Sequence, residues 1–294
     1  MKPVRKAVMP VAGLGTRVLP VAKSIPKNML NVVDRPILSY VVEEAKAAGI
    51  EHICFITGRG QEAIEHYFDR QPEIEDALAA KGKTDLLEEM AGELLQPGQM
   101  SFVRQTAPLG LGHAVWCARD VIGDEPFAVI LPDMLMDASP GALGQAISAY
   151  DQVGGNIIVV EAVPDSETHK YGVVSLAGRE GRLNQMTGMV EKPAPGTAPS
   201  NLIVSGRYVL QPEIFEALSV HQKGAGGEIQ LTDAMARLMT SQKFHALEYD
   251  GITYDCGDKI GLLRANVAFA LKRPDLAPAA RAAIELLLGN QAVL

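Results

Sequence analysis

The chain has 294 residues, of which 47% are apolar, and its 27 Lys and Arg face 35 Asp and Glu, a net charge of −8. This length suits an α/β domain, and the acidic balance excludes binding of a nucleic-acid polymer over an extended basic face. No stretch is apolar enough for a membrane span, and Gly13 and Arg17 interrupt the first apolar run, so we expect neither a signal peptide nor a membrane anchor.

The first predicted strand, residues 7–12, opens into the loop Gly13-Leu14-Gly15-Thr16-Arg17. Ligands of α/β proteins bind beyond the carboxyl ends of such strands, and glycines let backbone N–H groups face a phosphate. Residues 1–33 hold six basic side chains and no acidic one, although the whole chain is acidic. This segregation predicts an anion site in which Arg17 and Lys27 supply positive charge.

Two familiar phosphate-binding loops are excluded at this position. A dinucleotide-binding fingerprint needs a third glycine where Val18 stands, and a carboxylate at the end of the next strand, which instead ends in Thr57-Gly58. A Walker loop needs Gly-Lys-Ser/Thr after four intervening residues, which is also missing. A dehydrogenase is therefore disfavoured.

Helical and extended patterns alternate as far as residue 163. Helical spacing covers 36–49, 60–68 and 139–150, and strand character covers 52–57, 101–105, 127–131 and 156–163. This order is typical of a mainly parallel twisted sheet with helices on both faces. The intervening stretch 69–98 holds eight acidic and three basic residues, with leucines spaced as in short amphipathic helices. It is either a solvated excursion from the sheet or an oligomer contact.

A second glycine-rich turn, 108–115, follows the strand that ends at Gln105. Such a turn brings the backbone close to a ligand, and His113 is the only histidine beside a predicted binding loop. The continuously apolar strand 127–131 is typical of a buried parallel strand and ends in Pro132-Asp133. Asp133 is therefore placed either to bind a metal–phosphate complex or to cap the following turn.

From residue 171 onward, short β-like runs separated by Gly and Pro replace the alternation. They cover 171–176, 182–191 and 202–210, and predict an antiparallel extension that builds a second ligand subsite. Glu191-Lys192-Pro193 ends one run, where the acid and the base either serve that subsite or form a surface ion pair at an edge.

The rest of the chain contributes a second candidate metal ligand, Asp255. The remaining predicted elements are a helix at 211–218, a strand near 244–250 and an Ala/Leu-rich packing helix at 277–290. The three cysteines show no CxxC spacing, which favours buried thiols in a reducing cytoplasm. The six histidines form no zinc-site pattern, and no G-x-S-x-G elbow proposes a covalent nucleophile.

In their order along the chain, these motifs resemble those of the nucleotidyltransferases that activate sugar 1-phosphates. The resemblance covers nearly the whole chain and rests on residues 12–17, 26–30, 105–115, 131–133, 190–193, 198–202, 206–208, 227–233 and 254–259. Two positions depart from the family's pattern: Asn28 stands where Glu is more frequent, and Val11 stands where Ala is usual.

The resemblance implies one nucleotidyltransferase domain, 1–294, of Rossmann-like α/β fold. Its parts are a mainly nucleotide-binding half, 1–165, a mainly sugar-binding half, 166–272, and a C-terminal helical tail, 273–294. The implied reaction transfers the uridylyl group of UTP to α-D-glucose 1-phosphate, giving UDP-glucose and pyrophosphate, with Mg²⁺ as cofactor and a homodimer or homotetramer as assembly. A transferase that uses dTTP or another sugar, and a non-catalytic sugar-nucleotide sensor, remain the alternatives.

The resemblance also implies roles for individual residues. The residues expected to hold the triphosphate are Ala12, Gly13, Gly15, Thr16, Arg17 and Lys27. Those expected to read uracil are Gln105 and Gly110, and those expected to bind Mg²⁺ are Asp133 and Asp255. The sugar and its phosphate are expected to contact Gly172, Glu191 and Lys192. Four of these are expected to act in catalysis: Arg17, Lys27, Asp133 and Lys192.

Overall fold

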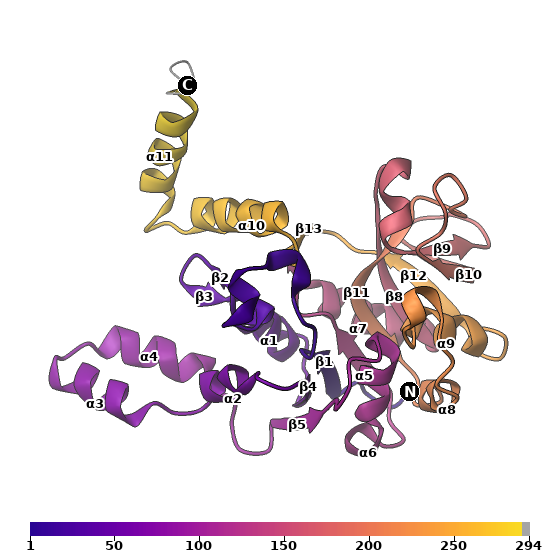
Figure 1. Ribbon diagram of the computed structural model, residues 1–294, viewed down its shortest axis with the longest axis horizontal. Coiled ribbons are helices and arrows are strands. Elements are labelled where there is room, and N and C mark those ends of the chain that lie inside the picture. The colour runs from indigo at the N-terminus through magenta and orange to yellow at the C-terminus, as the bar shows by residue number, and fades with distance from the viewer. Residues whose placement is uncertain (290–294) are drawn as a thin grey trace.

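A nine-stranded sheet forms the centre of the computed structural model, which describes residues 1–289 (Figure 1). Along the sheet its strands are β5 (Met100–Arg104), β4 (His52–Thr57), β1 (Lys6–Pro10), β6 (Phe127–Ile130), β11 (Leu202–Leu210), β8 (Asn156–Ala162), β12 (Phe244–Glu248), β10 (Leu183–Glu191) and β9 (Gly172–Leu176). The sheet is therefore continuous across the two predicted halves of the chain.

Parallel pairing dominates one side of this sheet and antiparallel pairing the other. β5, β4, β1 and β6 run parallel to one another. β11 then enters antiparallel between β6 and β8, β12 lies parallel to β8, and β10 and β9 continue antiparallel. The predicted α/β fold and its antiparallel extension are confirmed. β11 pairs with β6 on one side and β8 on the other, and it is buried along nearly its whole length, as expected for a central strand.

Helices cover both faces of the sheet because successive strand residues point to opposite sides. On β1, Ala7 and Met9 enter one core and Val8 enters the other. The first core packs α1 (Ile37–Ala47) and α7 (Ala142–Val153). The second packs α5 (Leu111–Cys117), α6 (Arg119–Ile122), α8 (Ile214–Ser219) and α9 (Leu231–Leu238). The predicted helices at 36–49, 139–150 and 211–218 are confirmed.

Two short antiparallel pairs and a third buried cluster complete the body. β2 (Asn31–Val32) pairs with β3 (Arg35–Pro36), and β7 (Met134–Asp137) pairs with β13 (Ile252–Asp255). The third cluster packs α10 (Lys259–Lys272) against β13, and Asp258 caps this helix by accepting hydrogen bonds from the N–H groups of Ile260 and Gly261. Three short 3₁₀ turns carry the N-terminal loop: Thr16–Val18, Val21–Lys23 and Lys27–Met29. The other two are Asp165–Lys170 and Ala225–Gly227.

Two helical arms project from this body (Figure 1). The acidic arm, residues 69–98, follows α2 (Glu62–Phe68) and consists of α3 (Pro72–Ala80) and α4 (Thr84–Glu93). The C-terminal arm, residues 259–289, consists of α10 and α11 (Ala277–Gly289). The short amphipathic helices predicted for 69–98 are thus confirmed.

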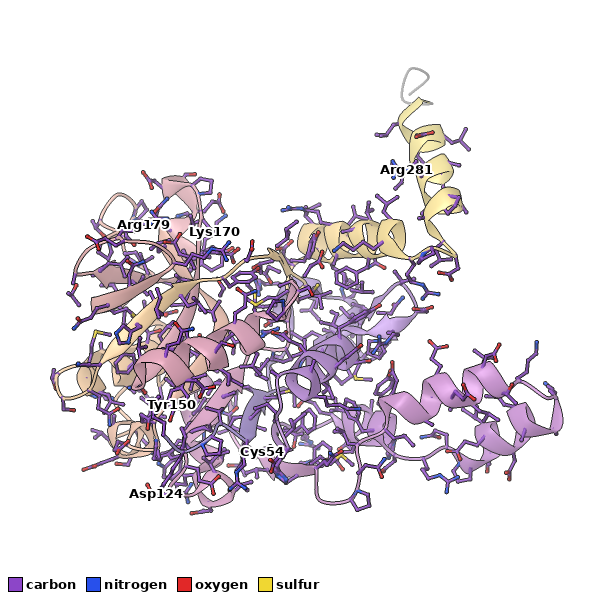
Figure 2. All side chains as sticks on the ribbon, turned by 180° about the vertical axis from the view of Figure 1, so that it is seen from behind. Cys54, Asp124, Tyr150, Lys170, Arg179 and Arg281 are labelled. Carbon is purple, nitrogen blue, oxygen red and sulfur yellow. The ribbon has the colours of Figure 1, made fainter. Side chains whose placement is uncertain are left out.

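The described part of α11 corrects one prediction. Residues 277–290 are predicted to form a packing helix, yet α11 contains no buried residue, and Leu286, Leu287 and Leu288 are exposed. Figure 2 shows Arg281 on this helix, well apart from the sheet. Residue 290 lies outside the described residues. Within residues 1–289, no helix has both the length and the apolar character that crossing a bilayer requires.

Candidate active site

Four charged side chains from distant parts of the chain meet beyond the carboxyl ends of β1 and β6. Lys27 Nζ lies 2.5 Å from Asp133 Oδ2, and Arg17 Nη2 lies 3.8 Å from the same oxygen. Arg17 Nη1 donates to Asp255 Oδ2 at 3.1 Å. The structure therefore places two predicted cations of the phosphate site against both predicted metal ligands. We call these four residues the phosphate cluster.

A buried arginine fixes the loop that carries Asp133. Arg207 on β11 is 0% exposed and pairs with Glu44 on α1 at 2.7 Å. Its other N–H groups donate to the carbonyls of Leu131 and Met134, at 3.0 and 2.8 Å, on either side of Asp133. Arg207 is not among the residues predicted for the site, although an arginine within an apolar strand is itself a signal, because a charge is buried only when it is paired.

Lys27 reaches Asp133 by crossing the glycine-containing loop. A Cβ on Gly13 would lie 3.3 Å from Lys27 Cε, and a Cβ on Gly15 would lie 3.1 Å from the Cβ atoms of Lys27 and Ala22. Gly15 also has a φ of +65°, which favours glycine. Both glycines therefore make room for the lysine that the loop presents.

Gly257 leaves room for the Arg17 guanidinium between the two carboxylates. A Cβ at this position would clash with Arg17 Nη2, and would lie 2.8 Å from Asp255 Oδ1 and 3.0 Å from Asp133 Oδ2. The Gly257 N–H donates to Asp255 Oδ1, and the Cys256 N–H donates to the Asp133 carbonyl, both at 2.8 Å. Two carboxylate oxygens thus approach one point from both sides. Gly257 is not among the residues predicted for the site, although it lies between Asp255 and Asp258 in the motif 254–259.

Burial and charge act differently on the two carboxylates. Burial by itself would raise the pKa of Asp133, but Lys27 and Arg17 outweigh it, so this pKa lies below its ordinary value. At Asp255, burial dominates and the charge of Asp133 adds to it, so the pKa lies above its ordinary value although Arg17 opposes the change. The Asp133 carboxylate is therefore stabilised by the protein, whereas that of Asp255 gains most from an added cation.

A cavity of about 490 Å³ opens beside the phosphate cluster, within the size range of small-molecule sites. Eight of the predicted site residues line it, namely Ala12, Gly13, Gly15, Thr16, Lys27, Gln105, Gly110 and Asp133. A larger hollow of about 740 Å³ lies against α2, α3 and α4 and shares no residue with it. The smaller cavity is the candidate site because the predicted residues converge there.

At its other end the cavity is bounded by the second glycine-rich turn. Gln105 Nε2 donates to the Gly110 carbonyl at 3.1 Å. Gly110 has a φ of +107°, and a Cβ on it would lie 2.8 Å from Glu228 Cβ and from the Ile229 carbonyl oxygen. The close approach predicted for this turn is thus partly to residues 228–229 of the chain itself, which only glycine permits.

A second group of side chains, the sugar cluster, lies at the ends of β9 and β10. Glu191 stands opposite Gly172 in the strand register, and a Cβ on Gly172 would lie 3.1 Å from Glu191 Oε2. Thr232 Oγ1 donates to Glu191 Oε2 at 2.7 Å. Burial raises the pKa of Tyr208 on β11, and the negative charges of Glu191 and Asp133 raise it further. Thr232 is not among the residues predicted for the site, although it belongs to the motif 227–233.

Lys192 lies at the exposed edge of the sugar cluster. Its Nζ is 3.7 Å from Glu191 Oε1, and its side chain is 53% exposed. Within residues 1–289, this is its only ion pair, so Lys192 pairs with neither Asp133 nor Asp255 of the phosphate cluster. Its φ of +46° is strained for a residue with a Cβ, a feature that is frequent at ligand sites.

Asn28, one of the two departures from the family's pattern, is completely buried. Neither its Oδ1 nor its Nδ2 has a hydrogen-bond partner among the described residues. Burial of an unpaired amide is unfavourable, but burial of an unpaired carboxylate is far more so. The neutral residue therefore suits this environment.

Clusters of metal-ligating side chains are absent from the part of the chain that the structure describes. Residues 1–289 contain no group of three or more His, Cys, Asp or Glu that could hold a metal ion. Asp133 and Asp255 are a pair, and Mg²⁺ is often bound by one or two carboxylates together with substrate phosphates. The pair therefore fits a cation that arrives with a phosphate ligand and takes the place of the Arg17 guanidinium between the two carboxylates.

Comparison with known proteins is consistent across sequence and structure. A family model described as nucleotidyl transferase matches residues 6–271. The UTP–glucose-1-phosphate uridylyltransferase of Bacillus subtilis is 49% identical over 276 residues, 94% of each chain, and that of Staphylococcus epidermidis is 45% identical over 287 residues, 98% of this chain and 99% of its own.

Two solved structures have the same fold over nearly their whole length. A UTP-bound UGPase from Acinetobacter baumannii has a TM-score of 0.88 and 47% identity, and the match covers 96% of this chain and 98% of that one. A UDP-glucose pyrophosphorylase complexed with UDP-glucose has a TM-score of 0.82 and 40% identity, and the match covers 92% of this chain and 100% of that one.

Proposed function

The chain belongs to the nucleotidyl transferase family, and from this premise we propose that it transfers the uridylyl group of UTP to α-D-glucose 1-phosphate, releasing pyrophosphate and UDP-glucose. Relatives with this name match nearly the whole chain, which favours UTP over dTTP and an enzyme over a sensor. The observation that carries the proposal is the phosphate cluster beside a nucleotide-sized cavity.

The attacking group needs no base from the protein. A sugar 1-phosphate has a second pKa near ~6, so at neutral pH its phosphate is already largely a dianionic nucleophile. This agrees with a cavity that no histidine lines. The reaction is an in-line attack on the α-phosphorus of UTP, and the work of the protein is positioning and charge stabilisation.

Repulsion between the two substrates is the barrier that the cations lower. Two unit charges 4 Å apart repel by roughly 1 kcal/mol in water and roughly 4 kcal/mol near a protein surface. Lys27 extends along the glycine loop that would hold the triphosphate, and Arg17 lies next to it. Both would stabilise charge on the α-phosphate and on the leaving pyrophosphate.

Mg²⁺ is the proposed cofactor, held by Asp133 and Asp255 on the two sides of Gly257. When bound, the ion would neutralise phosphate charge. On our proposal Lys27 and Arg17, which now pair with these carboxylates, turn to the phosphates of the nucleotide. The raised pKa of Asp255 supports this assignment, because a carboxylate whose charged form is disfavoured by burial gains from a further cation.

The sugar cluster would hold the second substrate. Gly172 lacks a side chain where Glu191 needs space, and Glu191 would accept hydrogen bonds from sugar hydroxyls. Lys192 is half-exposed and would orient the attacking phosphate. We accordingly keep the division into a nucleotide-binding half, 1–165, and a sugar-binding half, 166–272, with Asp255 as the residue that the second half contributes to the phosphate cluster.

Release of pyrophosphate in the presence of Mg²⁺ tests the proposal directly. The purified protein is incubated with UTP and glucose 1-phosphate, and in parallel with dTTP, with galactose 1-phosphate and with each substrate alone. We expect release only when both substrates are present, fastest with UTP and glucose 1-phosphate. Absence of release under all of these conditions would favour the sensor.

For the assembly, we propose a symmetric pair in which the acidic arm of each copy meets the C-terminal arm of the other. The acidic arm carries eight acidic and three basic residues, a net charge of −5, and the C-terminal arm five basic and two acidic, a net charge of +3. α3, α4 and α11 contain no buried residue within one chain. Opposite charges on two surfaces suit a two-fold axis, which forms both contacts at once.

Two complementary variants test this assembly. One reverses the acidic arm (Glu73→Lys, Asp76→Lys, Glu88→Lys) and the other the C-terminal arm (Arg264→Glu, Arg281→Glu). Each variant alone places like charges together and should be monomeric by light scattering. An equimolar mixture of the two variants should form mixed pairs. In such a pair the reversed acidic arm of one variant meets the reversed C-terminal arm of the other, and the two unchanged arms also carry opposite charges. A variant that assembles alone like the unmodified chain would exclude these arms as the interface.

A further inference from the structure

Both N–H groups of the Gln105 side chain are used within the protein. The Gly110 carbonyl can only accept a hydrogen bond, so the amide nitrogen Nε2, and not the oxygen, must face it at 3.1 Å. The same nitrogen lies 3.0 Å from His113 Nδ1, which must therefore accept the second N–H. Within residues 1–289, no group donates to Gln105 Oε1. The acceptor oxygen of a cavity-lining side chain is thus left for a ligand.

His113 is held in the form that this arrangement needs. It is 9% exposed, does not line the cavity, and lies against Trp116 and His221, with ring centroids 5.9 and 5.5 Å away. Burial, and to a smaller extent the neighbouring His221, lower the pKa of His113. A neutral ring that accepts at Nδ1 carries its proton on Nε2. His113 therefore lies behind Gln105 as a fixed acceptor.

We propose that His113 is a positioning residue that sets the base selectivity of the nucleotide site. By anchoring the Gln105 amide it turns Oε1 toward the base, so the site accepts bases with an N–H at position 3. Uracil and thymine have this donor, whereas N3 of cytosine is an acceptor, and two acceptors that face each other repel. This inference rests on the proposed function, and it identifies His113 as the residue that excludes CTP by holding Gln105 in this orientation.

The expected loss of base selectivity follows from the number of acceptors that orient the Gln105 amide, which are the Gly110 carbonyl and His113 Nδ1. A site built to hydrogen-bond one group of a substrate rejects an analogue that lacks it by about 10⁴-fold. Removal of the His113 acceptor leaves only the Gly110 carbonyl to orient the amide. We expect the preference for UTP over CTP in kcat/KM to fall by about tenfold, the usual effect of losing one hydrogen bond. The ratio of UTP to dTTP should stay constant, because both bases carry the N–H.

The experiment compares three substitutions of His113 with one control substitution on the same helix, α5, in the intact chain. His113→Leu removes the acceptor at similar volume, and His113→Phe serves as a second acceptor-free variant. His113→Asn keeps an acceptor near the position of Nδ1. Val115→Ala is the matched control, because Val115 is also buried on this helix but makes no hydrogen bond to Gln105. Kinetics with UTP, CTP and dTTP are combined with calorimetric binding of UTP and CTP in the absence of sugar phosphate.

The proposal predicts a pattern and not a general loss of activity. His113→Leu and His113→Phe should narrow the ratio of UTP to CTP in both measurements, mainly through the KM for the nucleotide, whereas His113→Asn should retain most of it and Val115→Ala all of it. An unchanged ratio in His113→Leu, or equal narrowing in Val115→Ala, would overturn the proposal. The calorimetric measurement separates the role of His113 from the proposed reaction. Selective binding of UTP without turnover would contradict the proposed reaction alone.

Discussion

The phosphate cluster and the sugar cluster hold their charges in different ways. In the phosphate cluster, Arg17 and Lys27 are already paired with Asp133 and Asp255, and three of the four side chains are largely buried. In the sugar cluster, the neutral hydroxyl of Thr232 donates a hydrogen bond to Glu191. The cation of this cluster, Lys192, is half-exposed, and its Nζ lies 3.7 Å from Glu191 Oε1. The phosphate cluster therefore pairs its cations closely with carboxylates, whereas the sugar cluster leaves Lys192 accessible to a ligand.

This difference indicates how each region would respond to its substrate. A phosphate that enters the phosphate cluster would draw Arg17 and Lys27 away from their carboxylates, and on our proposal a metal ion would take their place there. A phosphate that reaches Lys192 displaces only an exposed ion pair, which is worth about 0–1 kcal/mol. Substitutions in the first region should therefore change metal dependence and stability, and those in the second should change sugar-phosphate kinetics alone.

The largest effect is expected for Lys192→Ala. Turnover should fall by about 10³-fold, as when one group that stabilises transition-state charge is removed, while UTP affinity by calorimetry stays within about twofold. The exposed position of Lys192 means that its removal should leave the melting temperature unchanged. Lys192→Arg is the control that keeps the charge. Unchanged kcat in Lys192→Ala would exclude this residue from the mechanism and contradict the role given to the cation of the sugar cluster.

Asp133→Asn comes next, with an expected loss of about 10²-fold in kcat/KM that added Mg²⁺ restores only in part. The amide cannot serve as an anionic ligand and leaves Lys27 without its partner. A Mg²⁺ titration of the initial rate measures the change. Asp137→Asn is the matched control, because Asp137 pairs with Lys272 outside the cluster. Mg²⁺ dependence like that of the unmodified chain in Asp133→Asn would refute the ligand assignment.

Thr232→Val tests the sugar cluster without changing any charge. Loss of the hydroxyl leaves Glu191 Oε2 without its donor, and we expect the KM for glucose 1-phosphate to rise by about tenfold. The KM for UTP should not change, since Thr232 does not line the nucleotide cavity. Thr232→Ser should restore the KM. An equal change in both KM values would show that the two regions are not independent.

The smallest effect concerns stability in metal-free buffer, where the two carboxylates should behave in opposite ways. Asp133 has a lowered pKa, so its contribution is present above the unfolded value of about 4 and disappears as the pH falls through the folded pKa. Asp255 has a raised pKa, so folding opposes its ionisation, and its unfavourable contribution grows as the pH rises from about 4 through that pKa.

At pH 7, Asp133→Asn should therefore lower the melting temperature and Asp255→Asn should raise it. Each shift should be about 2–4 °C, which is the effect of roughly 1 kcal/mol in a chain of this size. The measurement is a thermal scan in EDTA at pH 7 and again near pH 4, where the difference between the variants should shrink. Shifts of the same sign would contradict the opposite roles of the two residues.

Local patterns in the sequence were sufficient for most elements of the fold. The spacing of apolar residues predicted α1 and α7, and the continuous apolar run at 127–131 predicted β6. The packing of α11 was not predictable in this way, because an amphipathic helix looks the same whether its apolar face meets the body or remains exposed. The insertion of β11 between β6 and β8 likewise depends on pairing between strands far apart in the chain.

The sequence by itself determined which residue types the site contains, because glycines, cations and carboxylates at strand ends are visible as local signals. Only the tertiary structure decided their partners: Arg17 meets Asp255 across 238 positions, Arg207 holds the carbonyls around Asp133, and His113 accepts from Gln105. Such contacts depend on how strands are ordered and how loops pack against one another. The energy of a charge or a hydrogen bond is set by distance and burial, and neither quantity is written in the spacing of residues along the chain.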